Sequence, residues 1–157
     1  DGIEGDDTDG HIDDLTRFVS ERAVVTVTEE DECDANHAPL QANFERLRSL
    51  AIDGKPLEIM TLPMPGRIVR EDLRLPASYA NFYICNACVI VPTFNDVNDR
   101  VALGILGELF RDRPVVTICP FITGGLDETE TAAALAEVRE SHTGVLVPGH
   151  DGGFRPA

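Results

Sequence analysis

Apolar residues in this chain follow the pattern of a strand in some segments and of an amphipathic helix in others. The order of these segments limits the possible folds more than any other feature. The ranges His11–Phe18 and Ala23–Thr28 predict strands, the second because it is rich in β-branched valine. A helix is predicted from Pro39 onward, and Asp53-Gly54 is expected to end it. One side of that helix carries an apolar stripe at spacings of four, three and four: Leu40, Phe44, Leu47 and Ala51. The range Leu57–Leu62 then predicts a strand again.

The same order of elements then repeats. Phe82–Ile84 and Cys88–Val91 predict two strands, and Pro114–Ile118 predicts a buried third. Between them a second amphipathic helix is predicted by apolar residues that recur every four positions: Val101, Ile105 and Leu109. The halves share a pattern but few residues, which indicates a modular α/β architecture of similar units. Two such units rarely close a symmetric assembly, so we expect this chain to be part of a larger one.

The remaining segments give weaker signals. Pro63–Pro76 is rich in proline near its start and is predicted to be a long connection. Asp127–Glu140 is rich in alanine, with acidic residues early, and predicts a helix. Gly144–Ala157 is rich in glycine and proline, and no clear element is expected there.

The charge of the chain limits its partners. The formal net charge is −15, and acidic residues are dense before Asp34. Nucleic acid is not an expected partner, because phosphate binding requires a basic surface. A cationic ligand fits better, although acidic side chains that only keep the surface solvated would give the same total. No apolar run approaches the ~20 residues of a membrane helix and no leader opens the chain, so we expect a cytoplasmic protein without membrane contact.

The chain has four cysteines, at positions 33, 85, 88 and 119. Cys85-Asn86-Ala87-Cys88 has the spacing of a metal-binding knuckle. No second such pair exists, and no histidine at a matching distance completes the four ligands that a structural zinc site needs. We therefore expect no metal, and we interpret the cysteines as reduced thiols, with the pair buried in strands.

Candidate site residues gather in Asp6–Asp14, which reads Asp-Asp-Thr-Asp-Gly-His-Ile-Asp-Asp. On a strand, residues two apart point to the same side, so His11 and Asp13 are expected to project together into one pocket. Histidine exchanges protons near neutral pH, and a carboxylate can hold a guanidinium through paired hydrogen bonds. Asp7 lies four residues before His11, on a glycine-flanked loop that could fold back towards the same pocket.

Two other interpretations of this segment stay open. A calcium loop of the EF-hand type requires acidic ligands at its positions 1, 3, 5 and 12, with glycine at 6. Aligning Gly10 at position 6 brings Asp7 and Asp9 into place, but it leaves Gly5 and Thr16 at the two ends. The segment could also be a solvated acidic turn with a histidine that has no chemical role.

Several long motifs in a fixed order carry a family resemblance. They are Gly2-Ile3-Glu4-Gly5, Asp7-Thr8-Asp9-Gly10-His11-Ile12-Asp13, Leu40-Gln41-Ala42-Asn43-Phe44-Glu45-Arg46-Leu47, Leu62-Pro63-Met64-Pro65, Leu75-Pro76-Ala77-Ser78-Tyr79-Ala80-Asn81-Phe82-Tyr83-Ile84, Val89-Ile90-Val91-Pro92-Thr93-Phe94 and Asn98-Asp99. With them the chain closely resembles the agmatine deiminase family, guanidine-modifying enzymes of the pentein superfamily, over roughly residues 1–118. The match divides the chain into a deiminase-like partial domain at 1–118 and a divergent tail at 119–157.

The resemblance implies a fold and an activity. The fold would be part of a five-bladed α/β propeller of ββαβ units, with the active site on its axis. The activity would be hydrolysis of agmatine to N-carbamoylputrescine and ammonia, in putrescine synthesis, without a metal or organic cofactor. Deimination of peptidyl-arginine is a closely related alternative. A non-catalytic module that binds guanidine or another cation through the same acids is a second alternative.

The resemblance also implies roles for the site residues. A cysteine thiolate attacks the guanidinium carbon, ammonia leaves, and water releases the product. His11 matches the general acid and base of the family. Asp13 matches a carboxylate that grips the guanidinium nitrogens, and Asp7 falls where another acid on the substrate side is expected.

Two departures from the family pattern lead us to expect that this chain is inactive. The family's N-terminal portion, which holds another guanidinium-binding carboxylate, is missing. The nucleophile is missing too, because the glycine-rich segment where the family carries His-Cys reads Gly149-His150-Asp151-Gly152-Gly153-Phe154 here. Cys119 is the last thiol and follows a predicted buried strand, where an inert thiol is expected. A shifted reading frame after Ile118 and a genuine divergent tail would both produce this pattern, and the oligomeric state is not predicted.

Overall fold

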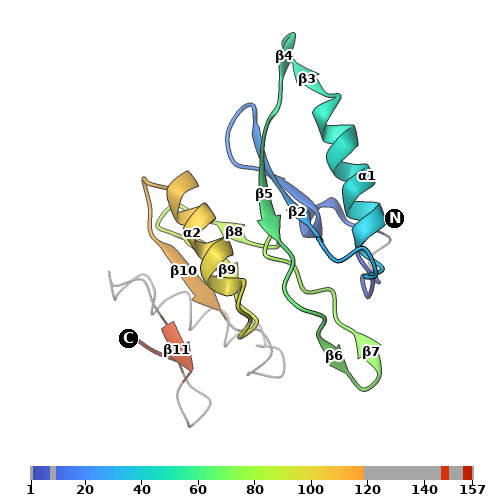
Figure 1. Cartoon of the computed structure of the whole chain (residues 1–157). Helices are drawn as coiled ribbons and strands as arrows, with labels where there is room; N and C mark the ends of the chain where they lie inside the picture. The colour runs from blue at the N-terminus through green and yellow to red at the C-terminus, as the bar shows by residue number, and fades with distance from the viewer. Residues whose placement is uncertain (1, 8–9, 119–145, 149–153, 157) are drawn as a thin grey trace.

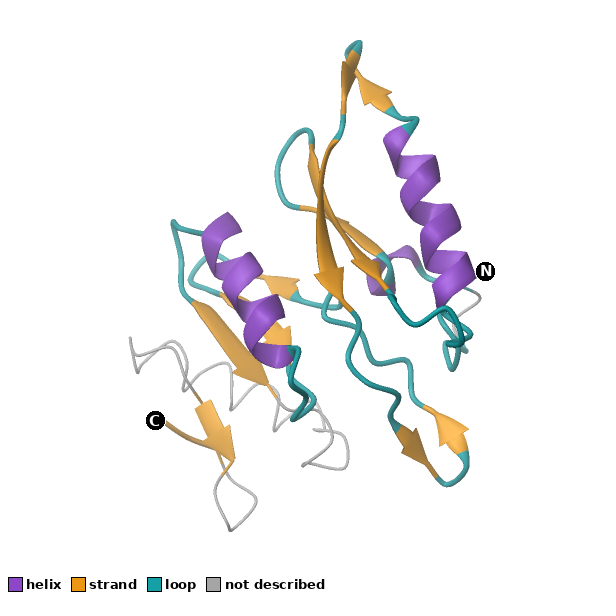
Figure 2. Cartoon of the chain, viewed as in Figure 1, coloured by secondary structure: helices purple, strands orange, loops and turns teal. Residues whose placement is uncertain are grey.

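The computed structural model describes residues 2–7, 10–118, 146–148 and 154–156 (Figures 1 and 2). Its main elements are arranged as two units of the order strand, strand, helix, strand, as the sequence predicts. Figure 1 shows one helix beside each of the two three-stranded sheets. The α/β class is therefore confirmed.

The first unit consists of β1 (Thr16–Phe18), β2 (Ala23–Thr28), α1 (His37–Arg48) and β5 (Glu58–Pro63). Its sheet has the order β1-β2-β5, in which β1 and β2 are antiparallel and β2 and β5 are parallel. Parallel neighbours require a long crossover, and α1 supplies it. β2 is the central strand and is buried along almost its whole length, which suits the run of β-branched residues that follows Ala23.

The second unit has the same topology. It consists of β8 (Tyr83–Ile84), β9 (Val89–Pro92), α2 (Asp99–Leu109) and β10 (Val115–Ile118). β9 is again central, antiparallel to β8 and parallel to β10. The repeated pattern of the sequence thus corresponds to a repeated ββαβ topology.

The two units share one hydrophobic core. The core includes fully buried side chains from both sheets and both helices, among them Val25, Val27, Leu40, Leu62, Val89, Val91 and Leu106. Polar contacts also join the units, because the Arg17 guanidinium donates to the carbonyl oxygen of Phe82 at 2.7 Å and lies 5.0 Å from the centre of its ring. Neither described helix is long and apolar enough to cross a membrane.

Several local predictions were wrong. The strand expected over His11–Phe18 begins only at Thr16, after a 3-10 turn, η1 (Ile12–Asp14). The first helix ends at Arg48, and Asp53-Gly54 instead forms the turn between β3 (Ala51–Ile52) and β4 (Lys55–Pro56). Asp53 and Gly54 both have positive φ, at 51° and 73°, as tight hairpin turns with Asp-Gly require.

Two further short pairings were not expected. The connection after β5 contains the hairpin of β6 (Val69–Arg70) and β7 (Leu73–Arg74), which extends to the bottom of Figure 1. Near the C-terminus, where no clear element was expected, β11 (Leu146–Pro148) pairs antiparallel with β12 (Phe154–Pro156). The helix predicted over Asp127–Glu140 lies outside the described residues.

A small polar network lies beneath α1. The side-chain amide of Asn43, 8% exposed, donates to Thr16 Oγ1 at 2.9 Å and to Thr26 Oγ1 at 3.0 Å. The two hydroxyls lie 2.9 Å apart, and Thr26 also donates to the Leu15 carbonyl. Asn43 therefore joins α1 to β1 and β2 by bonds that water cannot replace easily.

Replacing Asn43 with alanine should lower the free energy of unfolding by about 2 kcal/mol, because two buried hydroxyls lose their donor. Urea unfolding measures this loss. Gln41→Ala on the same helix is the matched control, since Gln41 is exposed and bonds only to Glu45 among the contacts described. Equal losses for the two variants would contradict the role of the network.

η1 turns the Asp14 side chain inward. Asp14 is 7% exposed, and its Oδ1 atom has no hydrogen-bond partner among the described residues. Burial, followed by the charges of Asp13 and Asp6, raises the pKa of Asp14 to about 6, against opposing effects of an Asn81 hydrogen bond and of His11. The folded chain therefore binds this proton more tightly than the unfolded chain, in which an aspartic acid has a pKa of about 3.9.

This shift predicts that Asp14 makes the protein less stable as pH rises. Its favourable contribution is present below the unfolded pKa and is lost as pH rises through about 6. Because of Asp14, the free energy of unfolding should fall by about 1 kcal/mol between about pH 5 and about pH 8. In Asp14→Asn this part of the fall should be absent. Urea unfolding at both pH values tests this, with Asp72→Asn on the exposed β6–β7 turn as control. An unchanged pH dependence in Asp14→Asn would refute it.

Candidate functional site

His11 and Asp13 lie at the start of η1, not on a strand. Gly10 has a φ of 80°, a conformation that glycine adopts readily, and the Leu15 amide closes the turn by donating to the Ile12 carbonyl at 3.0 Å. The alternation expected for a strand therefore does not apply. The turn nevertheless brings the two side chains near each other, with His11 Nδ1 3.9 Å from Asp13 Oδ1.

Both side chains are open to solvent. The imidazole is 65% exposed and the carboxylate 46% exposed, and 3.9 Å is longer than a direct hydrogen bond. The contact is therefore a loose one between two groups that can still bind something else, and it is an ion pair only when His11 is protonated. Such a pair can exchange protons through His11 and accept hydrogen bonds from a cation at Asp13.

Two further carboxylates lie close to this pair. The charges of Asp6, Asp13 and His11 all act on buried Asp14. Asp6 itself is partly buried. Asp7, which the sequence favoured, is exposed, and its role stays a prediction. The acidic cluster of Asp6, Asp13 and Asp14 thus includes two carboxylates that the sequence did not single out. The repeated Asp-Asp pairs at 6–7 and 13–14 could have indicated them.

A buried arginine holds the loop that leads to this cluster. Arg74 on β7 has a side chain only 5% exposed, and it donates to Glu4 and to Asp34, each at 2.8 Å. The Arg74 hydrogen bond lowers the pKa of Asp34, so that carboxyl stays ionised. The Glu4 amide also donates to Asn36 Oδ1 at 2.7 Å, just before α1. These contacts fix the N-terminal loop against both α1 and β7.

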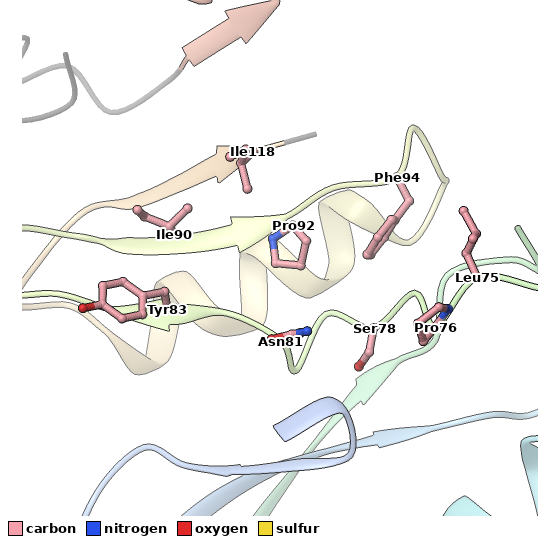
Figure 3. Close-up of a pocket in the computed structure, with 9 residues that line it drawn as sticks. All are labelled: Leu75, Pro76, Ser78, Asn81, Tyr83, Ile90, Pro92, Phe94 and Ile118. Atoms are coloured by element: carbon pink, nitrogen blue, oxygen red, sulfur yellow. The ribbon is translucent and has the colours of Figure 1, made fainter. Parts of the chain in front are cut away.

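A hollow of about 400 Å³ is lined by the connection at 75–81 and by the second unit (Figure 3). Its lining is mainly apolar: Leu75, Pro76, Ser78, Asn81, Tyr83, Ile90, Pro92, Phe94 and Ile118. In Figure 3 the Ser78 hydroxyl points towards the N-terminal segment, where it donates to the Asp14 carbonyl oxygen at 2.6 Å. Asn81 bonds to the Asp14 side chain. None of Asp6, His11, Asp13 and Asp14 is among the described residues that line the hollow. Asp14 is connected to it only by the hydrogen bonds with the lining residues Ser78 and Asn81.

The described residues contain no group of three or more histidine, cysteine or acidic side chains arranged to hold a metal ion. Cys33 is exposed, Cys85 is partly buried and Cys88 is buried, all as free thiols, and Cys119 lies outside the described residues. The chemistry that the described groups support is therefore proton exchange at His11 and cation binding by carboxylates.

Comparison with known proteins places these residues in a family. The model of the Porphyromonas-type peptidyl-arginine deiminase family matches residues 1–122. A relative from Marinomonas sp. (strain MWYL1), whose agmatine deiminase name is provisional, is 36% identical over 137 residues, covering 75% of this chain and 37% of its own length. A relative of the same provisional name from Legionella pneumophila (strain Paris) is 35% identical over 111 residues, covering 69% and 32%. This chain thus spans about a third of the length of each relative.

Solved structures agree with this match. A substrate-bound cysteine-to-serine variant of C. jejuni agmatine deiminase superimposes with a TM-score of 0.69 at 34% identity, covering 74% of this chain and 34% of that one. Agmatine deiminase of Enterococcus faecalis superimposes with a TM-score of 0.69 at 29% identity, covering 76% and 38%. The chain therefore belongs to the Porphyromonas-type peptidyl-arginine deiminase family, and the solved structures that it resembles include agmatine deiminases of the pentein fold.

Proposed function

We propose that this chain supplies the His11–Asp13 part of an agmatine deiminase active site. The enzyme would hydrolyse agmatine to N-carbamoylputrescine and ammonia, in putrescine synthesis. The observation that carries the proposal is the approach of the His11 imidazole to within 3.9 Å of Asp13, inside a cluster of acidic side chains. The membership of the chain in a deiminase family supports it.

The acidic cluster fits a guanidinium by charge and by shape. A guanidinium is planar and carries its donors in pairs, which match the two oxygens of a carboxylate. Asp13 is accessible enough to accept such a pair, and Asp6 and buried Asp14 add negative charge behind it. Asp7 is proposed as a further acid on the substrate side, because it is exposed on the same loop.

His11 would serve both halves of the reaction. A cysteine thiolate adds to the guanidinium carbon, and His11 protonates the departing nitrogen, which leaves as ammonia. His11 then removes a proton from water, which attacks the same carbon and expels the thiolate. The carbonyl oxygen of N-carbamoylputrescine comes from that water, and no metal or organic cofactor takes part.

None of the four cysteines of this chain is proposed as the nucleophile, because the glycine-rich segment at 149–154 contains no cysteine. No cysteine follows Cys119 in the sequence, and the family match ends at residue 122, four residues beyond the expected boundary at Ile118. We propose accordingly that residues 119–157 are a divergent tail, that the deiminase-like part at 1–118 belongs to a five-bladed propeller, and that this chain binds agmatine without converting it. A cytoplasmic location is part of the proposal, because free thiols suit a reducing compartment.

The family model favours one other substrate class, because its description names peptidyl-arginine. An arginine within a peptide presents the same guanidinium as agmatine but lacks the free amine at the other end. Stronger binding of an arginine-containing peptide than of agmatine would therefore favour that alternative. Binding of both without discrimination would favour a non-catalytic cation-binding module.

Replacing Asp13 with asparagine should weaken agmatine binding by about ten- to a hundredfold, because hydrogen bonds between charged groups contribute about 1.5–3 kcal/mol. Isothermal calorimetry measures the affinity. Asp53→Asn on the exposed β3–β4 turn makes the same chemical change away from the cluster and should leave the affinity unchanged. Equal affinity for the Asp13 and Asp53 variants would remove Asp13 from the site.

The purified chain should release no ammonia from agmatine above the rate in buffer, since the covalent route requires a thiolate. A coupled ammonia assay checks this. Clear turnover would show that one of the four cysteines acts as the nucleophile and would contradict the inactivity proposal. In a longer protein that does turn over agmatine, His11→Ala should remove nearly all ammonia release, and an unchanged rate would exclude His11 as the acid and base.

A further inference from the structure

Cys85 and Cys88 face each other across the turn that joins β8 to β9. The antiparallel register pairs Ile84 with Val89, and the Cys85 amide continues this pairing by donating to the Cys88 carbonyl oxygen at 3.0 Å. The two Sγ atoms lie 3.2 Å apart. The two thiols are therefore adjacent in a rigid position, and the proposed deiminase chemistry uses neither.

The hairpin around the two thiols is well held. The Arg113 guanidinium, just before β10, donates to the Cys85 carbonyl oxygen at 2.8 Å. Cys85 Sγ itself lies 2.9 Å from the Cys88 carbonyl oxygen. The 3.2 Å between the two Sγ atoms leaves only a small movement to the bond length of a disulfide, about 2.05 Å.

The two thiols differ in reactivity. Cys85 is partly exposed, whereas Cys88 is 2% exposed. Burial opposes ionisation of Cys85, but the hydrogen bonds from Cys88 and from nearby backbone amides hold its pKa below the ordinary value. Burial raises the pKa of the Cys88 thiol, and its contact with Cys85 adds to that effect. Cys85 is thus the accessible nucleophile and Cys88 the protected partner behind it.

We propose that Cys85 and Cys88 form a thiol–disulfide exchange site that reacts with small-molecule disulfides such as glutathione disulfide. The Cys85 thiolate attacks one sulfur of the glutathione disulfide, and one glutathione thiolate leaves. Cys88 then loses its proton, attacks Cys85 Sγ and displaces the second glutathione thiolate. The two protein thiols are oxidised to one disulfide, one glutathione disulfide is reduced to two glutathione molecules, and the two protons from the cysteines pass to these.

Two simpler interpretations of the pair fit less well. A zinc knuckle needs further ligands, and the described residues contain no cluster of three or more metal-binding side chains. Two inert thiols of a strand pair would both be buried, but Cys85 remains accessible and lies within 3.2 Å of the second sulfur.

Mass spectrometry of the whole chain after exposure to glutathione disulfide tests the proposal. Trypsin releases residues 75–100 as one peptide, which holds Cys85 and Cys88 and no other cysteine. After reaction at neutral pH, acid quench and alkylation, this peptide should lose both alkylation sites and be lighter than its dithiol form by two hydrogen atoms. Peptide 23–46, which carries Cys33 alone, should retain glutathione as a mixed disulfide.

Two variants identify the order of attack. Cys88→Ser should trap glutathione on Cys85, because the second displacement is lost. Cys85→Ser should leave Cys88 free of glutathione and open to alkylation only after unfolding. A 75–100 peptide that stays doubly alkylated, or that carries glutathione without closing, would overturn the proposal, as would glutathione uptake by Cys88 in the Cys85→Ser variant.

Discussion

One buried guanidinium determines where the acidic N-terminal loop lies. Arg74 donates to Glu4 on that loop and to Asp34 before α1, both at 2.8 Å, from a side chain that is almost fully buried. Asp34 is largely buried with the guanidinium, whereas Glu4 is 41% exposed, so Arg74 ties a buried ion pair to the surface loop. η1 follows this loop and is anchored in turn by the Ser78 hydroxyl. The His11–Asp13 pair therefore lies on a loop and a turn that are both held by hydrogen bonds. Its solvent-exposed side is accessible to a ligand.

Burial explains which parts of the fold could be predicted. β2 is packed in the shared core, so its sequence carries the β-branched residues that suit a buried strand. In α2 the buried residues are Ala102 and Leu106, whereas Val101 of the predicted stripe is 50% exposed, so the stripe predicted the helix but not its buried face. β3 and β4 have two residues each and are mostly exposed, so they leave no periodic signal. Asp53-Gly54 did carry a turn signal, but it belonged to that hairpin and not to the end of α1.

The sequence indicated which types of residue form the candidate site, but not the backbone conformation that positions them. His11 and Asp13 approach each other because η1 is a tight turn, whereas the sequence had suggested a strand. The burial of Asp14 depends on Ser78, which is 64 positions away in the chain, so no local pattern could reveal it. The motifs that carry the family resemblance include Ser78, but the one with His11 stops at Asp13, and only the fold brings Ser78 to Asp14.

The central claim is that a guanidinium binds between His11 and its neighbouring carboxylates, and NMR of the histidine-labelled chain during an agmatine titration tests it most directly. The chain has four histidines. His37, the first residue of α1, is the internal control. Its Nδ1 is already engaged by the Glu29 carbonyl oxygen at 2.7 Å. The imidazole signals of His11 should shift until the site is saturated, while those of His37 stay in place. Unchanged His11 signals, or equal shifts at His11 and His37, would contradict the claim.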